Sequence, residues 1–133
     1  MQRREFAKST VLGVVAAAAM PVVGRAQGAD PYKNVVFTAD DPGHWEKVEK
    51  LHIPETTVIA GKLTIKTPHP MSEAHYIVSH TVVLGDGTFL SRKTFAYTDQ
   101  PVSEHTLPAG YKGKVTVTST CNLHDWWAKS ISV

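Results

Sequence analysis

The sequence predicts an all-β protein, an immunoglobulin-like sandwich of about seven strands. Two features of the chain point to this fold class. Beyond residue 26, no window of helix length shows the periodicity of apolar side chains that marks an amphipathic helix. Instead, short β-branched or alternating runs recur, and turn-forming residues separate them. The expected strands are residues 35–38, 57–66, 76–84, 89–97, 103–107, 114–120 and 128–133.

Turn chemistry accounts for the breaks between these runs. Proline fixes φ, glycine allows positive φ, and aspartate can bond to its own backbone, so all three favour turns. Such residues occupy 41–43 (Asp-Pro-Gly), 85–87 (Gly-Asp-Gly), 99–101 (Asp-Gln-Pro) and 108–110 (Pro-Ala-Gly), and the pair Ala60 and Gly61 falls inside the second run. The length and spacing indicate one domain without internal repeats.

The first 26 residues have the pattern of a signal peptide. Basic residues precede a moderately apolar stretch at 11–23, and the Gly-Arg-Ala sequence at 24–26 offers small residues for cleavage. The stretch is too short for a transmembrane helix, which needs roughly 20 apolar residues. We therefore expect cleavage near Ala26, a mature domain of residues 27–133, and no membrane anchor on the mature form.

Arg3, Arg4, Phe6 and Lys8 stand in an arrangement that resembles the twin-arginine export signal. The resemblance implies that the twin-arginine export machinery carries the protein across a bacterial-type membrane after it has folded. A protein exported in this way can acquire a metal in the cytoplasm, away from competing copper and zinc outside. We therefore expect a periplasmic protein.

The charge of the mature domain argues against a nucleic-acid partner. The formal net charge of the whole chain is +2. Residues 1–26 hold four basic residues and one acidic residue, a net of +3, which leaves the remainder near −1. A nucleic-acid-binding domain needs a concentration of positive charge that this balance does not provide.

Cys121 is the only cysteine in the sequence, so no disulfide can form within the chain. A mature domain of about 107 residues has a modest core. Any stabilisation beyond that core must therefore come from a bound metal or from a homo-oligomer.

Three fragments of the sequence carry histidine or cysteine at spacings that suit a metal site. Residues 49–54 read Glu-Lys-Leu-His-Ile-Pro, 69–77 read His-Pro-Met-Ser-Glu-Ala-His-Tyr-Ile, and 121–124 read Cys-Asn-Leu-His. Each fragment alone is a weak signal. Together they offer four imidazoles, which suit iron, copper and zinc, and one thiolate, which narrows the choice towards softer or redox-active ions. Five such ligands leave one position of the ion open for a small molecule.

These fragments resemble the iron-binding domain of the superoxide reductases, the desulfoferrodoxin and neelaredoxin family, and the resemblance extends from about residue 44 to residue 133. It implies one mononuclear iron that cycles between Fe²⁺ and Fe³⁺. His52, His69, His75 and His124 would lie in a plane around it, and Cys121 would be the axial ligand opposite the open position. The chain is similar to the single-iron branch, since the other branch adds a four-cysteine domain.

The resemblance also implies an activity, the one-electron reduction of superoxide to hydrogen peroxide. Because the chain has no second redox centre, the electron would have to come from an external donor, either another protein or a small molecule.

The fragment before His52 departs from the family pattern Glu-Lys-His-Val-Pro, because Leu51 precedes the histidine. Either Leu51 replaces the lysine, or one inserted residue bulges the loop and leaves Glu49 and Lys50 in the family's roles. In the family, the lysine attracts superoxide and assists protonation, while the glutamate can occupy the open position of oxidised iron. The resemblance therefore makes Lys50 and Glu49 the candidate catalytic residues.

The remaining histidines, His44, His80 and His105, are assigned no function. Trp126 and Trp127 follow the last candidate ligand, and we expect one to shield the thiolate and the other to pack into the core.

Two other functions fit parts of the pattern. A sandwich that ends in Cys-x-x-His before its last strand also resembles the cupredoxins, which are copper-binding electron carriers. Such sites usually have a methionine shortly after the histidine, but residues 125–129 contain none, and His69 and His75 would be superfluous. A non-catalytic sandwich that binds a partner or carries sulfur on Cys121 would leave the four spaced histidines unexplained.

Overall fold

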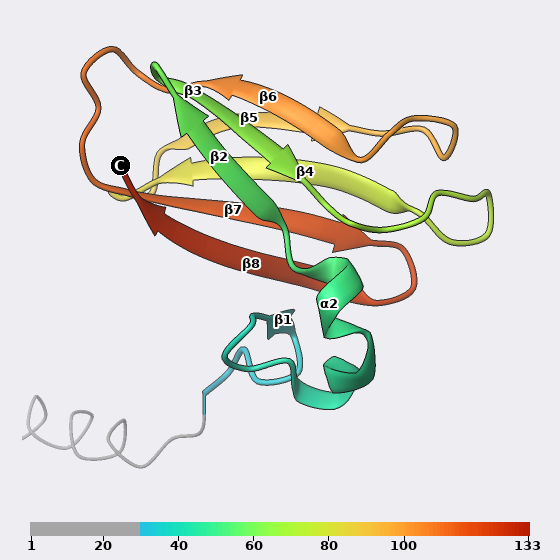
Figure 1. The fold of residues 1–133 in the computed structure, drawn as a ribbon. Helices are drawn as coiled ribbons and strands as arrows, with labels where there is room; N and C mark the ends of the chain where they lie inside the picture. The colour runs from blue at the N-terminus through green and yellow to red at the C-terminus, as the bar shows by residue number, and fades with distance from the viewer. Residues whose placement is uncertain (1–29) are drawn as a thin grey trace, which may run out of the picture. The chain divides into compact units, whose positions relative to one another are not determined.

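The computed structural model describes residues 30–133, and in this part of the chain eight strands form two sheets (Figure 1). The strands are β1 (Val36–Phe37), β2 (Glu55–Ile59), β3 (Lys62–Lys66), β4 (Ile77–Leu84), β5 (Phe89–Thr94), β6 (Val102–Thr106), β7 (Lys114–Cys121) and β8 (Asp125–Ser132). The larger sheet has the order β1-β8-β7-β4-β5, and the smaller has the order β2-β3-β6. All strand pairs are antiparallel except β1 with β8. The prediction of an all-β fold is confirmed.

The eighth strand arises because the run at 57–66 is a hairpin and not a single strand. Ala60 and Gly61 connect β2 to β3, and their φ angles are 50° and 76°. Positive φ at both central residues is the conformation of a type I′ turn, whose twist matches that of the flanking strands. The turn signal at these two residues therefore divided the expected strand.

Two short helical segments lie between β1 and β2, a region without helical periodicity in its sequence. A 3₁₀ helix, η1 (Gly43–Val48), is followed by one α-helical turn, α2 (Glu49–His52). Trp45 interrupts the first segment with φ and ψ of −97° and 17°. Neither piece is long enough to display a periodic apolar face, and no helix within residues 30–133 has the length and apolarity needed to cross a membrane.

Figure 1 shows β3 and β6 of the smaller sheet above β4 and β7 of the larger one. The core lies between these two layers. Leu63 and Ile65 of β3 form one buried cluster with Val82 of β4 and with Val115 and Val117 of β7. Alternate residues along a strand point to one face, which is why every second residue of β3 and β7 is buried. Both sheets contribute to this cluster, so the fold is a sandwich.

Pairing between β4 and β7 places two connections at the same end of the sandwich. Ile77, the first residue of β4, pairs with Cys121, the last residue of β7. The connection from β3 to β4 and the turn from β7 to β8 are therefore neighbours. Asn122 fixes them together, because its side-chain oxygen accepts the Tyr76 N–H at 3.0 Å and its amide group donates to the Ala74 carbonyl at 3.1 Å.

Candidate metal centre

Four histidines and one cysteine converge at this end of the sandwich. One ligand atom from each of them lies within 4.8 Å of all the others. His52 ends α2, two histidines lie in the β3–β4 connection, Cys121 ends β7, and the last histidine lies in the β7–β8 turn; the set is His52, His69, His75, Cys121 and His124. These are the five residues singled out from the sequence, and the structure brings all of them together.

The β3–β4 connection folds back on itself and so brings two histidines into contact. The backbone N–H groups of Ser72 and His75 donate to each other's carbonyl oxygens at 3.0 and 3.1 Å. This tight turn directs the His75 ring towards His69, and their Nε2 atoms lie 3.0 Å apart. The connection can therefore offer two imidazole nitrogens to one ion.

The β7–β8 turn places the thiol beside the last histidine. Cys121 pairs with Asp125 across the turn, and Asp125 has a positive φ of 64° that closes it. The indole N–H of Trp127 donates to the carbonyl of His124 at 2.9 Å. Cys121 Sγ and His124 Nδ1 consequently lie 3.7 Å apart.

His52 is oriented by the helical turn to which it belongs. Its Nδ1–H donates to the Val48 carbonyl at 2.7 Å, four residues earlier in the chain. This bond fixes the tautomer and leaves Nε2 free to bind a metal. That Nε2 is buried and has no hydrogen-bond partner among the described residues. Trp127 stacks beneath the ring, with centroids 5.5 Å apart.

Hydrogen bonds cannot satisfy this cluster. His75 Nε2 lies 3.0 Å from His69 Nε2, 3.0 Å from His124 Nδ1 and 3.2 Å from Cys121 Sγ. A ring nitrogen carries either one hydrogen or one lone pair, so it can serve only one of these three neighbours. A metal ion resolves the conflict, because nitrogens bound at about 2.1 Å in adjacent positions lie about 3.0 Å apart. The residues present therefore fit a bound metal.

Burial prepares these rings for metal binding. Desolvation is the main cause that lowers the pKa of His69 to about 4 and lowers the pKa of His52 and His124 below 6.5. The rings are therefore neutral at neutral pH, which is the form that binds metals. Burial also raises the pKa of the Cys121 thiol. A bound cation reverses that effect, because a coordinating thiol is deprotonated.

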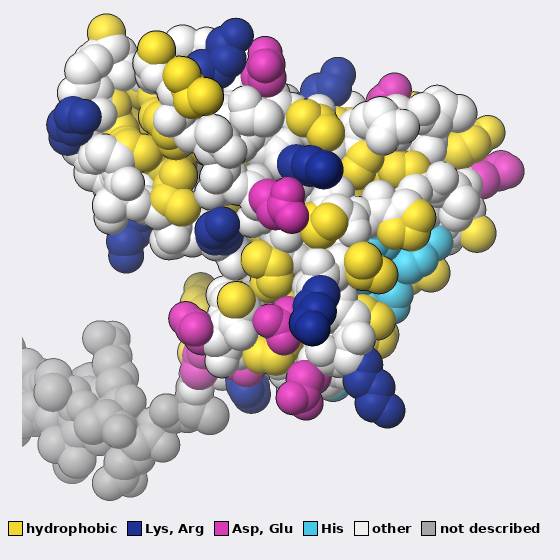
Figure 2. Space-filling view, viewed as in Figure 1, with side chains coloured by type: hydrophobic (Ala, Val, Ile, Leu, Met, Phe, Trp, Pro, Cys, Tyr) yellow, Lys and Arg dark blue, Asp and Glu magenta, His cyan; other side chains and the backbone are white. Residues whose placement is uncertain are grey.

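The cluster is buried on one side and reaches solvent on the other. His52, His69 and Cys121 are buried, whereas His75 and His124 are half-buried. In the space-filling view, histidine side chains come to the surface together on this side of the domain (Figure 2). A small molecule can therefore approach the cluster without an opening of the sandwich.

Glu49 and Lys50 lie in α2, three and two residues before His52. Glu49 is half-buried, Lys50 is exposed, and Leu51 is 47% exposed. The N–H of Ile53 donates to the Glu49 carbonyl at 3.1 Å, so the segment is a helical turn. Successive residues of a helix point in directions about 100° apart, so Lys50 and Leu51 present different faces.

Three further histidines lie outside the cluster. His44 is at the surface and bonds to the Asn34 side chain, with 3.1 Å between His44 Nδ1 and Asn34 Oδ1. His80 and His105 are buried between the sheets, and each bonds to Ser103 Oγ at 2.8 Å.

Tryptophans behave partly as expected from the sequence. Trp127 is fully buried, but Trp126 is 56% exposed. Trp126 pairs with Thr120, one residue before the buried Cys121, so it lies on the opposite face of the sheet. Trp127 therefore packs into the core as expected, but Trp126 does not shield the thiolate, so that half of the prediction is wrong.

Trp45 contacts the cluster, although nothing in the sequence singles it out. Its ring packs edge-on against His124, with centroids 4.6 Å apart. Its indole N–H donates to Asp125 Oδ2 at 3.0 Å. These contacts span about 80 residues of sequence, and no local pattern could have revealed them.

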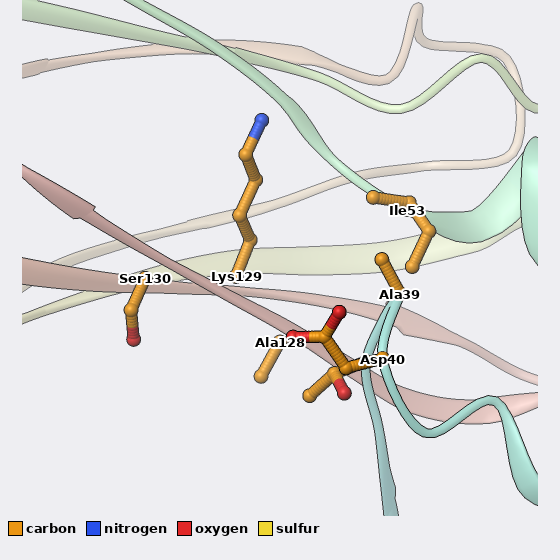
Figure 3. A pocket seen from close by; sticks show the side chains of 7 residues that line it. Ala39, Asp40, Ile53, Ala128, Lys129 and Ser130 are labelled. Atoms are coloured by element: carbon orange, nitrogen blue, oxygen red, sulfur yellow. The ribbon is translucent and has the colours of Figure 1, made fainter.

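A hollow of about 450 Å³ lies beside β8, and Figure 3 shows the side chains that line it. Asp40 and Lys129 are its charged residues, and Ile53 lines another side. None of the five clustered residues lines it, so the candidate site is the histidine–cysteine cluster and not this hollow.

A β-sandwich that gathers four imidazoles and one thiolate at one end is the framework of a mononuclear metalloprotein. A sequence model of the family described as Desulfoferrodoxin matches residues 39–130, and the chain therefore belongs to the desulfoferrodoxin family. None of the curated proteins compared with the chain matches it.

Solved structures show the same fold. A variant of the superoxide reductase (neelaredoxin) from Ignicoccus hospitalis has a TM-score of 0.67 and 22% identity, covering 79% of this chain and 98% of that one. The superoxide reductase from Giardia intestinalis has a TM-score of 0.56 and 22% identity, covering 63% and 99%. The superoxide reductase from Nanoarchaeum equitans has a TM-score of 0.55 and 24% identity, covering 63% and 94%. At these identities the likeness establishes the fold.

Proposed function

We propose that this chain is a superoxide reductase, an oxidoreductase that holds one iron on His52, His69, His75, His124 and Cys121. The observation that carries the proposal is the convergence of these five donors to within 4.8 Å of one another. Membership of the desulfoferrodoxin family and the names of the structural neighbours support the same activity. Four imidazoles with one thiolate suit a redox-active ion.

Iron bound there would supply one electron to superoxide, which takes up two protons and leaves as hydrogen peroxide, and an external donor would then restore the ferrous state. The chain's own residues prepare this chemistry. Val48 holds the His52 ring through its carbonyl, and Trp127 holds the His124 backbone. The first contact orients the His52 ring and raises its basicity. The second fixes the backbone that carries the His124 ring.

The proposal also assigns roles to Lys50 and Glu49. Superoxide is an anion, and clustered positive charge raises the rate at which such a substrate arrives. Lys50 is exposed on α2, two residues before the buried His52. We assign it the attraction of superoxide and the delivery of a proton. Glu49, half-buried in the same turn, would supply a carboxylate ligand to oxidised iron.

The copper-carrier alternative is not favoured. A cupredoxin-like site would use fewer donors than the five that converge here. The nearby sulfur of Met71 already accepts the Ile77 N–H at 3.3 Å. Transport of sulfur on Cys121 is also disfavoured, because only 2% of that residue is exposed to a partner.

Export of the protein to the periplasm by the twin-arginine machinery is part of the proposal. The residues that suggest it, 1–26, lie outside the described part of the chain. Replacing Arg3 and Arg4 with lysine should leave iron-loaded protein in the cytoplasm, and cell fractionation measures this. Unimpaired export of the double variant would contradict the twin-arginine route.

The decisive experiment measures metal content, absorption spectrum and superoxide reduction of protein folded in the cytoplasm. We expect one iron per chain and, in the oxidised form, a thiolate-to-iron charge-transfer band that the Cys121→Ser variant lacks. One copper per chain with an intense blue band would contradict the proposal. An iron protein whose band survives in Cys121→Ser would contradict only the assignment of Cys121 as a ligand.

A further inference from the structure

A chain of hydrogen bonds joins buried polar side chains between the two sheets. It runs from Ser91 to His105 (2.5 Å), to Ser103 (2.8 Å), to His80 (2.8 Å), to Thr67 (2.8 Å) and to Ser119 (2.6 Å). Apart from the half-buried Ser91, all its members are buried. The candidate metal site does not include any of them. Its last two members, however, each lie two residues before a candidate ligand: Thr67 before His69, and Ser119 before Cys121.

Every polar atom of Thr67 forms a hydrogen bond. Its N–H donates to the Pro101 carbonyl at 3.0 Å, and its own carbonyl accepts the His69 N–H at 2.8 Å. Its hydroxyl bonds to His80 Nε2 at 2.8 Å and to Ser119 Oγ at 2.6 Å. Only 1% of the residue is exposed. Thr67 is thus a fixed point immediately before the connection that carries His69.

Little backbone freedom remains between Thr67 and the His69 ring. Pro68 and Pro70 flank the histidine, and proline locks its own φ near −65°. The residue before a proline is also restricted, which limits both Thr67 and His69. A displacement of Thr67 would therefore be passed on to the histidine.

Ser119 has the same relation to the thiol. It lies two residues before Cys121 in β7, and both are buried on the same face of the strand. The Thr67–Ser119 hydrogen bond and the 3.9 Å approach of His69 Nε2 to Cys121 Sγ are therefore two successive links between the same two segments. The first link is a hydrogen bond formed by the protein alone, and the second joins two candidate ligands.

We infer that Thr67 is a positioning residue: the hydrogen bond between its hydroxyl and that of Ser119 sets where His69 Nε2 lies relative to Cys121 Sγ. The inference rests on the proposed function in one respect, that His69 and Cys121 hold the same iron. Partners that orient metal ligands typically contribute about 10- to 100-fold to metal affinity.

The test uses the iron-loaded full chain and two readouts besides activity: the energy of the thiolate-to-iron band and the rate of iron loss to a chelator. Thr67→Val keeps the shape of the side chain and removes the hydroxyl. We expect a shifted band and iron loss accelerated about 10-fold or more. Thr67→Ser restores the hydroxyl and should restore both readouts.

Ser103→Ala is the matched control, because it breaks the same buried chain one histidine away from Thr67. It should lower the thermal stability of the protein as Thr67→Val does, but leave the band and the iron-loss rate near those of the wild type. Ser119→Ala removes the inferred hydrogen bond from the other segment. It should produce the same shifted band, so it tests the inference even if Thr67→Val does not fold.

Three results would overturn the inference. A wild-type band and iron-loss rate in Thr67→Val or Ser119→Ala would show that the bond does not position His69. Equal changes in Ser103→Ala would reduce the effect to general destabilisation. A wild-type protein that binds no iron would overturn the proposed function and this inference with it, so the two failures are distinguishable.

Discussion

The Nε2 atoms of His69 and His75 lie 3.0 Å apart. His75 Nε2 has two more close neighbours, Cys121 Sγ at 3.2 Å and His124 Nδ1 at 3.0 Å. Four donor atoms at these separations would be in conflict without a cation between them. A metal ion bound by all four atoms removes this conflict, so the arrangement fits a metal site.

Loss of any one clustered histidine should weaken iron retention. We expect His52→Ala, His69→Ala, His75→Ala and His124→Ala each to lower affinity by more than the roughly 10- to 100-fold typical of outer-shell partners. The measurement is the iron-to-protein ratio after dialysis against a chelator. His44→Ala and His105→Asn serve as exposed and buried controls. Equal losses in controls and cluster variants would contradict the division of the histidines.

Buried His80 should make the fold sensitive to acid. Burial, with a smaller contribution from the charge of His105, lowers the pKa of His80 from 6.5 to about 4. In the unfolded chain the ring binds a proton below about pH 6.5, whereas in the folded protein it stays neutral down to about pH 4. The contribution of His80 to the free energy of unfolding is therefore fully present above pH 6.5 and is lost as the pH falls towards 4. Between pH 7 and pH 5 the loss from this residue is about 2 kcal/mol.

His80→Gln provides the comparison, because glutamine can keep hydrogen bonds to Thr67 and Ser103 but does not titrate. Urea unfolding at pH 7 and pH 5 should show a smaller pH dependence for the variant than for the wild type. The difference between the two proteins isolates His80 from the other histidines. Identical pH dependence would mean that His80 is not held neutral by the fold.

Trp45 should hold the β7–β8 turn, and with it His124, in place. Trp45→Phe keeps an aromatic ring on the histidine but removes the indole N–H that donates to Asp125 at 3.0 Å. We expect iron loss to a chelator to accelerate, by roughly 10-fold if the contact acts as other outer-shell partners do. Trp126→Phe, on the outer face of the sheet, should leave the rate unchanged. The reverse order of the two variants would exclude this role for Trp45.

Features set by neighbouring residues could be predicted from the sequence, whereas contacts between distant residues could not. Strand runs and turn residues reflect neighbouring positions, so they predicted most of the strands. The run at 57–66 predicted one strand, and the turn at Ala60 and Gly61 divides it into β2 and β3. The resemblance to a known family predicted that the five clustered residues bind one metal. The helical segment at 43–52 is too short for a periodic signal. Contacts of Trp45 with Asp125, and of Thr67 with Ser119, join residues 80 and 52 positions apart, so only the fold could bring them together.

The last prediction concerns the departure from the family pattern before His52. Lys50 is exposed in α2, and Leu51, on another face of the turn, is 47% exposed. If Lys50 attracts superoxide, Lys50→Ala should slow the second-order reaction by roughly 10-fold at low salt and weaken its dependence on ionic strength. The spectrum of the iron should not change, because Lys50 is not a ligand.

Pulse-radiolysis rates at low and high salt decide between the two alternatives for this fragment. Lys47→Ala is the matched control, because Lys47 is also exposed and lies three residues earlier, in η1. A lysine that acts through its position near the site should differ from Lys47, whereas a change in net charge alone would affect both variants equally. If Leu51 has instead taken the lysine's place, Lys50→Ala will match the wild type at both salt levels, and Leu51→Lys will accelerate the reaction.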